Sequence, residues 1–546
     1  MATSTDHSPT CADAIVGTLT AHGVDRIFCL PGVQNDAFFN ALFDAGNRIR
    51  PIHTRHEQAA AYMALGAALS TGKPAVYSVV PGPGLLNTFA ALATAYSTNA
   101  PVVCLTGQIA SKMIDKGIGV LHEIPHQLDL LKTLTKWADR VSEPQDGASK
   151  TAEAFRQMLS GRWRPVGLEI PPDILFGKSP VSHAEPLALI PDAPLDEDAI
   201  AKAAKLLGDA RNPIICVGGG SQDASAEVRA LAERLQAPVI AYRMGRGVLD
   251  DRHPLSHTLT AGNHFWKSAD VILAVGTRSQ ARQMVWGTDE NMKVIQVDID
   301  PAEFERSPKP HLGIVGRAAQ VLSKISDALE RTGGKRPSRD DEMREVKARV
   351  ARQWQEVQPQ QGLLQALREA LPENGVVVDE LTQVAYASRA LWPVYEPRSF
   401  ISSGYQGTLG WGFCAALGVK AARPDRPVVS LTGDGGFMFG ANEMATAVQH
   451  NLATITVLFN DGAYGNVQRA QVMDYGNRVI ATELRNPDFM KFAESFGAMG
   501  IRANGPVELK AAVQKALKAD VPALIEVPCE PMPSPWKLID PGKVRG

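Results

Sequence analysis

The chain has 546 residues, which is too long for one hydrophobic core, because single cores stop growing at roughly 250–300 residues. We therefore expect about three domains. The formal net charge of −2 excludes the strongly basic surface of a nucleic-acid-binding protein. No apolar run reaches the roughly 20 residues of a membrane span, and residues 1–10 lack the pattern of a signal peptide. The six cysteines form no C-x-x-C pair, so we expect neither disulfides nor a zinc site. We therefore expect a protein of the reducing cytoplasm.

The first third of the chain alternates short apolar runs with helical stretches, which is typical of a parallel βαβ sheet. Strands are predicted at residues 26–30, 51–53, 75–80 and 102–106, with helices that begin near Asp36, Thr54 and Leu85. Turns rich in Gly and Pro follow two of these strands, at residues 31–32 and 81–84. They lie at the carboxyl edge of the predicted sheet, where such sheets bind ligands.

The same alternation of predicted strands and helices begins again twice later in the chain. A second series of strands is predicted at residues 213–217, 238–242, 271–275 and 294–297, and a third at residues 375–378, 427–431, 455–459 and 523–527. Residues 331–352 are highly charged and predict a solvated linker that runs into a helix. The predicted fold is therefore α/β, with three doubly wound parallel-sheet domains at residues 1–180, 190–335 and 356–546.

The strongest local motif is Gly-Asp-Gly-Gly at residues 433–436, between an apolar strand and a predicted helix at residues 440–450. An Asn-Asp pair, residues 460–461, directly follows the next predicted strand. Because adjacent parallel strands end at the same edge of a sheet, Asp434 and Asp461 should lie side by side. Hard oxygen ligands of this kind suit Mg²⁺.

Two glycines of this motif, Gly435 and Gly436, have no side chains, so their backbone N–H groups can approach a diphosphate. A tight turn with a helix-capping Asp is the alternative interpretation of the motif alone, and the second acidic motif favours the metal site. A dinucleotide fingerprint is a competing phosphate motif, but neither residues 433–436 nor residues 218–220 complete G-x-G-x-x-G.

Residues 433–461, GDGGFMFGANEMATAVQHNLATITVLFND, resemble the cofactor signature of thiamine diphosphate enzymes, which begins with GDG and ends with NN. The resemblance implies thiamine diphosphate and Mg²⁺ as cofactors. It makes Asp434, Asp461 and the backbone carbonyl of Ala463 the metal ligands. Asp461 stands where the family usually has its second Asn, which adds a negative ligand. The residues implied to contact the cofactor's diphosphate are Gly433, Gly435, Gly436, Thr382, Gln383, Tyr464 and Gly465.

Residues 54–60, TRHEQAA, resemble the family's RHE motif, which makes Glu57 a candidate catalytic residue. In the family this carboxylate hydrogen-bonds N1′ of the aminopyrimidine ring. It promotes the tautomer whose N4′ removes the thiazolium C2 proton. The alternative for an isolated Glu is a first-turn acid that the helix dipole favours.

Residues 402–412, SSGYQGTLGWG, resemble the segment that contacts the aminopyrimidine. The resemblance implies that Leu409 holds the cofactor bent, as part of the catalytic machinery, and that the Gly407 carbonyl accepts a hydrogen bond from N4′. An apolar residue between glycines is otherwise a packing residue. The position of this segment before the GDG motif favours the family interpretation.

Three further segments, at residues 81–108, 297–304 and 486–497, resemble the acetolactate synthase-like group. In this group the first and last domains meet across a dimer interface, so the resemblance implies a homodimer or homotetramer with its active site across the interface. Arg282 matches the arginine that holds the carboxylate of the second keto acid, and a guanidinium fork suits this task. The alternative is a solvated helix arginine.

Two departures separate the chain from acetolactate synthases. His122 replaces the amide of the F-Q-E motif and could titrate near neutral pH, so it is a candidate for catalysis and for substrate binding. Both His122 and His126 have an alternative as ordinary polar residues of a loop, and their spacing without a third ligand argues against zinc. Residues 260–264 match the flavin-contacting segment of those synthases poorly, which makes FAD doubtful.

We therefore expect an enzyme that decarboxylates a 2-keto acid, or cleaves a 2-hydroxyketone, and transfers the acyl carbanion to a carbonyl acceptor. A simple decarboxylase or lyase is the nearest alternative, although the paired histidines of pyruvate decarboxylase-type enzymes are not visible near position 120. A catalytically silent relative is disfavoured by the intact Glu57, Asp434 and Leu409. A flavin- or nicotinamide-dependent oxidoreductase is a third class, which predicts a cofactor that absorbs visible or near-ultraviolet light.

Overall fold

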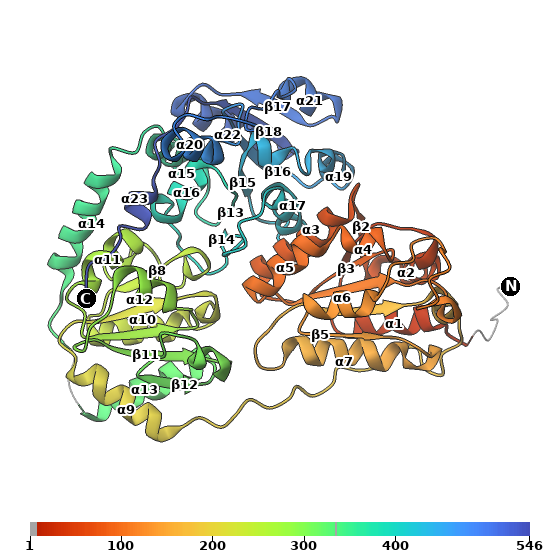
Figure 1. Cartoon of the computed structure of the whole chain (residues 1–546), viewed down its shortest axis with the longest axis horizontal. Helices are drawn as coiled ribbons and strands as arrows, with labels where there is room; N and C mark the ends of the chain where they lie inside the picture. Colours follow the sequence, from red (N-terminus) through yellow and green to blue (C-terminus); the bar gives the residue numbers. More distant parts are fainter. Residues whose placement is uncertain (1–7, 333–335) are drawn as a thin grey trace. The chain divides into compact units, whose positions relative to one another are not determined.

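The computed structural model describes residues 8–332 and 336–546. Within these residues the chain forms three sheets, each of six parallel strands, with helices packed on their faces (Figure 1). The strand orders are β2-β1-β3-β4-β6-β5, β12-β11-β10-β7-β8-β9 and β14-β13-β15-β16-β18-β17, so the first and third sheets share one topology. This arrangement confirms the predicted α/β fold with three parallel sheets.

The first sheet has the strands β1 Arg26–Cys29, β2 Arg50–His53, β3 Ala75–Val79, β4 Val102–Gly107, β5 Trp137–Arg140 and β6 Val166–Ile170. Its helices are α1 Cys11–Ala21, α2 Asp36–Ala45, α3 Glu57–Thr71, α4 Pro83–Leu86, α5 Phe89–Thr98, α6 Gln127–Thr133, α7 Gly147–Leu159 and α8 Pro172–Leu175. The four predicted strands are confirmed, with ends that differ by one residue. The single helix predicted from Leu85 is wrong. Two helices form instead, because the hydroxyl and the backbone N–H of Thr88 both donate to the Leu85 carbonyl, at 2.7 and 2.9 Å, and close the first one.

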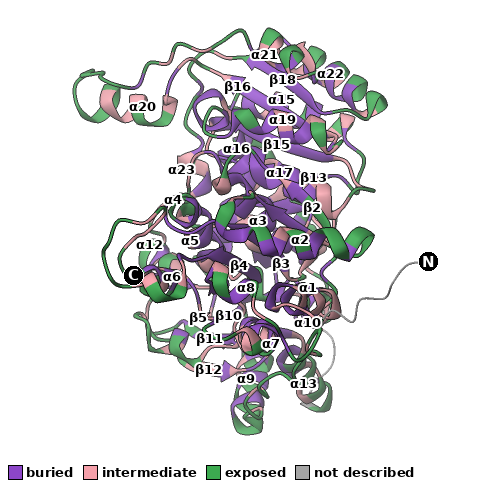
Figure 2. Cartoon of the chain, turned by 90° about the vertical axis from the view of Figure 1, so that its right-hand side faces the viewer, coloured by how far each residue is buried: buried purple, intermediate pink, exposed green. Residues whose placement is uncertain are grey.

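Helix α3 is buried on almost every side and carries the colour of buried residues in Figure 2. Helix α17, Trp411–Ala422, packs along it. A Cβ added at Gly66 would lie 2.1 Å from the carbonyl oxygen of Ala415, and one at Gly418 would lie 1.9 Å from that of Met63. Both glycines are therefore needed for this contact between two helix backbones.

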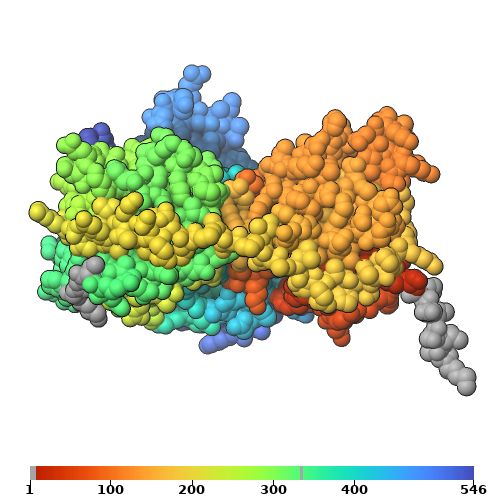
Figure 3. Space-filling view, turned by 90° about the horizontal axis from the view of Figure 1, so that it is seen from below, coloured from red at the N-terminus to blue at the C-terminus, as the bar shows by residue number. Residues whose placement is uncertain are grey.

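The second sheet has the strands β7 Pro213–Val217, β8 Val239–Ala241, β9 Ser256–His257, β10 Val271–Val275, β11 Lys293–Asp298 and β12 Leu312–Val315. Its helices are α9 Glu197–Asp209, α10 Ser225–Leu235, α11 Leu259–Trp266, α12 Gln280–Trp286 and α13 Ala318–Thr332. Helix α9 begins where it does because the Asp196 carboxylate accepts from the N–H of Ala199 at 2.9 Å. Helices α9 (yellow) and α13 (green) lie next to each other on the surface seen in Figure 3. All four strands predicted here are present.

The third sheet has the strands β13 Val376–Asp379, β14 Phe400–Ile401, β15 Val428–Gly433, β16 Thr454–Asn460, β17 Met499–Arg502 and β18 Ala523–Pro528. The remaining helices are α14 Asp340–Trp354, α15 Gln360–Ala370, α16 Gln383–Leu391, α18 Asp434–Phe437, α19 Met444–Gln449, α20 Gly465–Asp474, α21 Phe489–Ser495, α22 Pro506–Ala519 and α23 Trp536–Ile539. The helix predicted at residues 440–450 is shorter than expected, because a 3-10 turn, Ala441–Glu443, precedes α19. The helix predicted at the end of the charged segment is α14, while residues 333–335 of that segment lie outside the described residues.

The residues of the three sheets and their helices divide into two compact units. One consists of Met1–Pro191, Ser403–Pro424 and Met438–Leu452, and the other of Asp192–Ser402, Asp425–Phe437 and Ala453–Gly546. Helices α17 and α19 therefore pack with the first sheet, although their residues follow the third predicted domain boundary. The predicted domain boundaries stay a prediction. None of the helices in the described residues is both long enough and apolar enough to span a membrane.

Candidate active site

The acidic motifs of the third sheet meet as predicted at the carboxyl ends of two adjacent strands. Strands β15 and β16 are parallel neighbours, and Gly433 pairs with Phe459 at their ends. Asp434 is 2% exposed, and burial raises the pKa of its carboxyl group. Asp461 has an exposed side chain, but desolvation of its carboxyl group and the neighbouring charge of Asp434 raise its pKa to about 6. Both shifts favour the protonated acid, although the charge of Arg469 also acts on Asp461, so the negative charge of this pair is only partly compensated in the chain alone.

Amide groups, rather than cationic side chains, contact this carboxylate pair. Asn486 donates to Asp434 Oδ2 at 2.6 Å and to Asn460 Oδ1 at 2.9 Å. The amide of Asn460 in turn donates to Glu526 at 2.8 Å. Within the described residues neither Asp434 nor Asp461 takes part in an ion pair of 4.0 Å or less. A divalent cation fits this donor set, because it would neutralise both carboxylates.

The described residues contain no cluster of three or more His, Cys, Asp or Glu side chains able to hold a metal. Two carboxylates do not complete the coordination shell of Mg²⁺, which commonly keeps waters or substrate phosphate oxygens as further ligands. The loop that carries Ala463 follows directly after Asp461, whose Oδ1 accepts from the N–H of Ala463 at 3.4 Å. The donor set would therefore suit a metal ion that shares its remaining ligands with a phosphate better than an all-protein metal site.

Three glycines beside this pair cannot be replaced without a clash. A Cβ at Gly435 would lie 2.7 Å from the ring of Tyr464, and one at Gly465 would lie 2.3 Å from Asp461 Oδ2. A Cβ at Gly436 would lie 2.4 Å from Glu380 Oε1. The glycines of the motif thus allow other side chains to approach closely, in addition to leaving their own N–H groups accessible.

The start of helix α16 joins the same group of residues. A Cβ at Gly433 would lie 3.8 Å from Thr382 Cγ2, and the Thr382 hydroxyl caps α16 by accepting from the N–H of Val384 at 3.2 Å. Gln383 donates to Asn466 at 3.3 Å, and its buried Oε1 has no hydrogen-bond partner. The structure therefore brings together all the residues predicted to hold the metal and the diphosphate: Thr382, Gln383, Gly433, Asp434, Gly435, Gly436, Asp461, Ala463, Tyr464 and Gly465.

Glu57 belongs to the other compact unit, where it is the first residue of α3. It is half-buried, and its Oε2 accepts from the side-chain amide of Asn87 at 3.0 Å. Its Oε1 lies 3.5 Å from the position that a Cβ at Gly84 would take. Glu57 is thus held against the turn at residues 81–84 that follows β3.

His122 lies at the other end of this turn. A Cβ at Gly82 would lie 2.4 Å from the His122 carbonyl oxygen, and His122 Nδ1 is 3.1 Å from Gln34 Oε1. Its backbone has a φ of 68°, which is uncommon for a residue other than glycine. His126, in contrast, is exposed and lies 3.9 Å from Asp129. The structure therefore brings His122, but not the side chain of His126, into the surroundings of the turn that contacts Glu57.

The segment that carries Gly407 and Leu409 lies beside α3. The Tyr62 hydroxyl, on α3, is 3.4 Å from Thr408 Oγ1. Gly407 and Gly410 have φ angles of 58° and 81°, which are accessible to glycine without strain. Leu409, between them, is half-buried and thus only partly covered by the chain.

A buried acid that the sequence did not single out supports the start of α3. Glu443 is 0% exposed and accepts from the backbone N–H of Arg55 at 3.1 Å and from the Thr446 hydroxyl at 2.5 Å. Burial raises the pKa of its carboxyl group. Arg55 precedes Glu57 by two residues, so Glu443 fixes the loop from which Glu57 projects. Its only sequence signal is that it is the one charged residue among residues 441–449.

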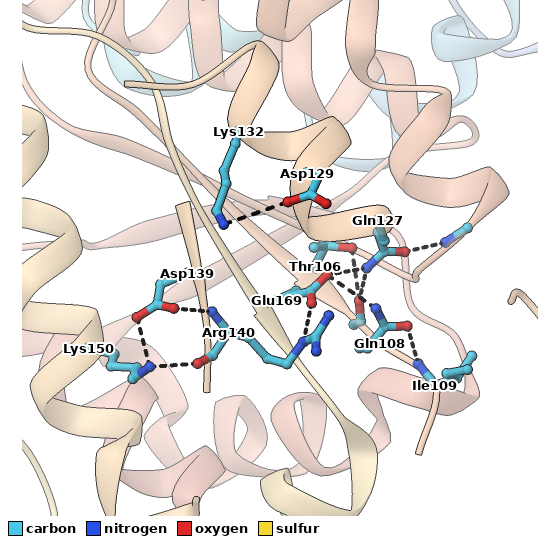
Figure 4. Close-up of polar contacts among 12 residues, drawn as sticks. Thr106, Gln108, Ile109, Gln127, Asp129, Lys132, Asp139, Arg140, Lys150 and Glu169 are labelled. Carbon is cyan, nitrogen blue, oxygen red and sulfur yellow. Dashed lines mark hydrogen bonds and ion pairs between the residues drawn. The ribbon is translucent and has the colours of Figure 1, made fainter. Parts of the chain in front are cut away.

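A second buried acid has a different set of partners (Figure 4). Glu169, on β6, is 0% exposed and forms an ion pair with Arg140. Gln127 and Gln108 also donate to it, at 2.9 and 3.2 Å. Gln127 accepts from the N–H of Gly82 at 2.8 Å, so this network also anchors the turn next to Glu57. Its donors fully surround the carboxylate, as expected for a structural charge.

Arg282, the predicted substrate-binding arginine, lies on α12. Its Nη1 is 2.9 Å from Asp540 Oδ1, and the same oxygen accepts from Trp286 Nε1 at 3.2 Å. The sequence did not indicate this partner, which is 258 residues away in the chain. The role of Arg282 in substrate binding stays a prediction.

Comparison with known proteins agrees with this geometry. Profiles of the thiamine pyrophosphate enzyme N-terminal TPP binding domain, central domain and C-terminal TPP binding domain match residues 9–132, 200–325 and 381–527. The chain belongs to the thiamine pyrophosphate enzyme family. This membership confirms the resemblance found in the cofactor signature and supports thiamine diphosphate as the cofactor.

The similar curated proteins include synthases and a decarboxylase. The chain is 32% identical to a probable acetolactate synthase large subunit of Methanocaldococcus jannaschii, over 97% of this chain and 93% of that protein. It is 30% identical to the acetolactate synthase isozyme 1 large subunit of Escherichia coli, over 99% of this chain and 97% of that protein. A probable 2-ketoarginine decarboxylase of Pseudomonas aeruginosa is 33% identical, over 89% of this chain and 88% of that protein. The chain is therefore acetolactate synthase-like along its whole length.

Proposed function

We propose that this enzyme uses thiamine diphosphate and Mg²⁺ to decarboxylate a 2-keto acid and to transfer the acyl group to a carbonyl acceptor. The observation that carries the proposal is the pair of Asp434 and Asp461, which forms no ion pair of 4.0 Å or less among the described residues and lies beside closely packed glycines. The similarity to acetolactate synthase large subunits supports the reaction class.

The candidate metal ligands and the candidate catalytic acid have separate tasks in this proposal. Bound thiamine diphosphate supplies a carbanion and an electron sink. Asp434, Asp461 and the Ala463 carbonyl hold Mg²⁺. The Glu57 carboxylate, oriented by Asn87, exchanges a proton with the cofactor's pyrimidine ring.

Three further residues shape the surroundings of the reacting atoms. Leu409 is an apolar contact for the cofactor, and the Gly407 carbonyl is its hydrogen-bond acceptor. His122 is a proton donor or acceptor for the substrate, and Gln34 sets the orientation of its ring.

We also propose that the enzyme is cytoplasmic. We propose further that it is a homodimer or homotetramer in which the partner subunit completes the active site. Analytical ultracentrifugation measures the number of subunits and so tests this assembly.

A product analysis separates this function from its nearest alternative, a simple decarboxylase, which the similarity to a probable 2-ketoarginine decarboxylase favours. The Mg²⁺- and thiamine diphosphate-loaded protein is incubated with a panel of 2-keto acids, with and without aldehydes, and products are identified by mass spectrometry. Hydroxyketones together with CO₂ support the proposal. Free aldehyde alone supports the decarboxylase, and the absence of CO₂ contradicts both.

Glu57→Gln is the matched control for this experiment. The amide has the same shape but cannot exchange the proton, so turnover should fall roughly 10²–10⁴-fold. Cofactor affinity and the thermal unfolding temperature should stay close to those of the wild type. Turnover near the wild-type value would remove Glu57 from the mechanism.

A further inference from the structure

The C-terminal segment, residues 536–546, is fastened to helices α11 and α12 of the second sheet. The side chains of Thr260 and Asn263 donate to the carbonyls of Leu538 and Gly542, at 2.6 and 3.0 Å. The backbone N–H groups of residues 544 and 545 both donate to the Trp286 carbonyl at 3.0 Å. The segment is therefore held on both sides of Asp540.

An ion pair between Arg545 and Asp289 fastens the end of the segment. Arg545 Nε lies 2.5 Å from Asp289 Oδ2, and the Arg545 carbonyl lies 1.7 Å from where a Cβ at Gly287 would be. Gly287 has a φ of 85°, so a larger residue there would both strain the backbone and clash. The chain thus leaves room at α12 for its own C-terminus.

Within this segment Asp540 reaches the guanidinium of Arg282. The ion pair is 2.9 Å long, and the side chains are 25% and 32% exposed. The guanidinium also lies 5.9 and 5.6 Å from the ring centres of Tyr242 and Trp286. Arg282 is therefore a partly covered cation with a carboxylate already in place.

A carboxylate-bearing substrate would have to compete with Asp540 for this cation. Asp540 is held by its own backbone, so it contacts Arg282 without the loss of translational freedom that a free keto acid would suffer. Its Trp286 contact, at 3.2 Å, further fixes the carboxylate. Any keto acid must displace this group or bind beside its negative charge.

We propose that Asp540 is the built-in counter-ion of Arg282 and that the acceptor of this enzyme is consequently an uncharged aldehyde rather than a second keto acid. This inference rests on the proposed function and on the predicted role of Arg282 in binding a substrate carboxylate. In the reaction, the C–C bond between the donor's carbonyl and carboxylate breaks and releases CO₂. The acyl carbon bonds to the aldehyde carbon, and the new alkoxide takes one proton from solvent. The product is a neutral 2-hydroxyketone, with no net oxidation or reduction.

The first test compares acceptors in the holoenzyme. With pyruvate as donor, the kcat/KM ratio of an aldehyde to a keto acid acceptor should favour the aldehyde in the wild type. Asp540→Asn should lower this ratio about tenfold or more, because it frees one charge-assisted hydrogen bond of Arg282. A wild type that prefers the keto acid, or an unchanged ratio in the variant, would overturn the inference.

Asp289→Asn is the matched control, because it breaks the other ion pair of the segment without touching Arg282. It should leave the acceptor ratio unchanged. An equal change in both variants would mean that loosening of the segment, and not the charge of Asp540, sets the preference, and would overturn the inference. CO₂ release without ligation of either acceptor would also overturn it, while the proposed decarboxylation would stand.

A binding measurement decides the contact independently of turnover. Oxamate carries a carboxylate and an unreactive amide in place of a ketone, and its binding to the holoenzyme is measured by calorimetry. Asp540→Asn should bind oxamate about tenfold or more tightly than the wild type, and the Arg282→Ala, Asp540→Asn double variant should lose this gain. No gain in the single variant would overturn the inference. If no 2-keto acid releases CO₂, the proposed function fails, and this result still shows whether Asp540 blocks Arg282.

Discussion

Two acids of this chain are buried near the ends of parallel strands, and they differ in what surrounds them. Glu169, in the first sheet, is 0% exposed and receives hydrogen bonds from one arginine and two glutamines. Asp434, in the third sheet, is 2% exposed, accepts hydrogen bonds from the Asn486 amide and from backbone N–H groups, and has a second carboxylate, Asp461, beside it. Burial alone therefore does not mark a functional acid. The distinguishing feature is whether a cation forms an ion pair with the buried acid: Arg140 does so with Glu169, and none of the described residues does so with Asp434.

The largest expected effect follows from removing the charge of Asp434. Asp434→Asn should weaken Mg²⁺-dependent thiamine diphosphate binding by at least about 100-fold, because loss of even an outer-shell partner of a metal costs about 10–100-fold. The thermal unfolding temperature of the cofactor-free protein should not fall, since a costly buried charge is gone. Fluorescence titration with the cofactor at fixed Mg²⁺, together with circular dichroism, measures both quantities.

Asp488→Asn is a suitable control for this variant. Asp488 is a nearby exposed acid that caps α21 by accepting from the N–H groups of Met490 and Lys491, and Asn caps helices equally well. Its cofactor affinity should match that of the wild type. If Asp434→Asn kept full affinity as well, the carboxylate pair would not be the metal site.

Removing the charge of Glu169, which forms an ion pair with Arg140, should affect the stability of the fold rather than cofactor binding. Glu169→Gln leaves Arg140 without its carboxylate, and breaking a fully buried ion pair costs roughly 3–5 kcal/mol. The side chain of Arg140 is 25% exposed, so we expect a loss of about 2–3 kcal/mol in the free energy of unfolding. Urea denaturation measures this loss. A Glu169→Gln protein with wild-type stability would end the distinction between the two acids.

The pH dependence of Mg²⁺ affinity offers a third test. A carboxylate must lose its proton to bind a cation, and the pKa of Asp461 is raised to about 6. Below pH 6 the apparent Kd for Mg²⁺ should rise about tenfold for each pH unit, and above pH 7 it should be flat. Calorimetric titration across this range measures the slope.

The same shift makes the stability of the cofactor-free protein depend on pH. The folded-state pKa of Asp461 lies above the value of about 3.9 in an unfolded chain. The stabilisation from this group is therefore present below pH 4 and is lost as the pH rises through 6. Mg²⁺ should restore stability above pH 6, and a Tm that rises with pH in this interval without metal would contradict the raised pKa.

The smallest effect is expected for Asp461→Asn. This change restores the residue that the family signature usually has, and an amide oxygen is still a hard ligand. Mg²⁺ affinity at pH 8 should fall only about tenfold, and its pH dependence between 5 and 7 should flatten. A variant that keeps the full pH slope would show that another group is responsible for it.

Much of the fold could be predicted because the central strands of parallel sheets are buried on both faces and form continuous apolar runs. Strand β6 escaped prediction because Glu169 interrupts its apolar run. Strands β5 and β17 escaped because they lie at sheet edges and are only half-buried. Most of the predictable strands are thus those buried on both faces, and the edge strand β2 is an exception.

The candidate site shows the same division. Asp434 and Asp461 could be placed together, because parallel strands bring the turns after them to one edge. Asn87 and Glu443 could not be found, because an Asn or Glu becomes a partner only through tertiary contacts. The contact of Asp540 with Arg282 joins residues 258 positions apart, and no local pattern indicates it.

The contact between α3 and α17 limits which chimeras of related enzymes can fold. A chimera that took its N-terminal half from one parent and its C-terminal half from another would pair helices with separate evolutionary histories. Gly66 and Gly418 leave no space for a methyl group, so a parent with alanine at either position would force these helices apart. The first helix begins at Glu57, and the second follows the segment that contains Leu409. Recombination should therefore take both helices from the same parent, even where the junctions between sheets are compatible.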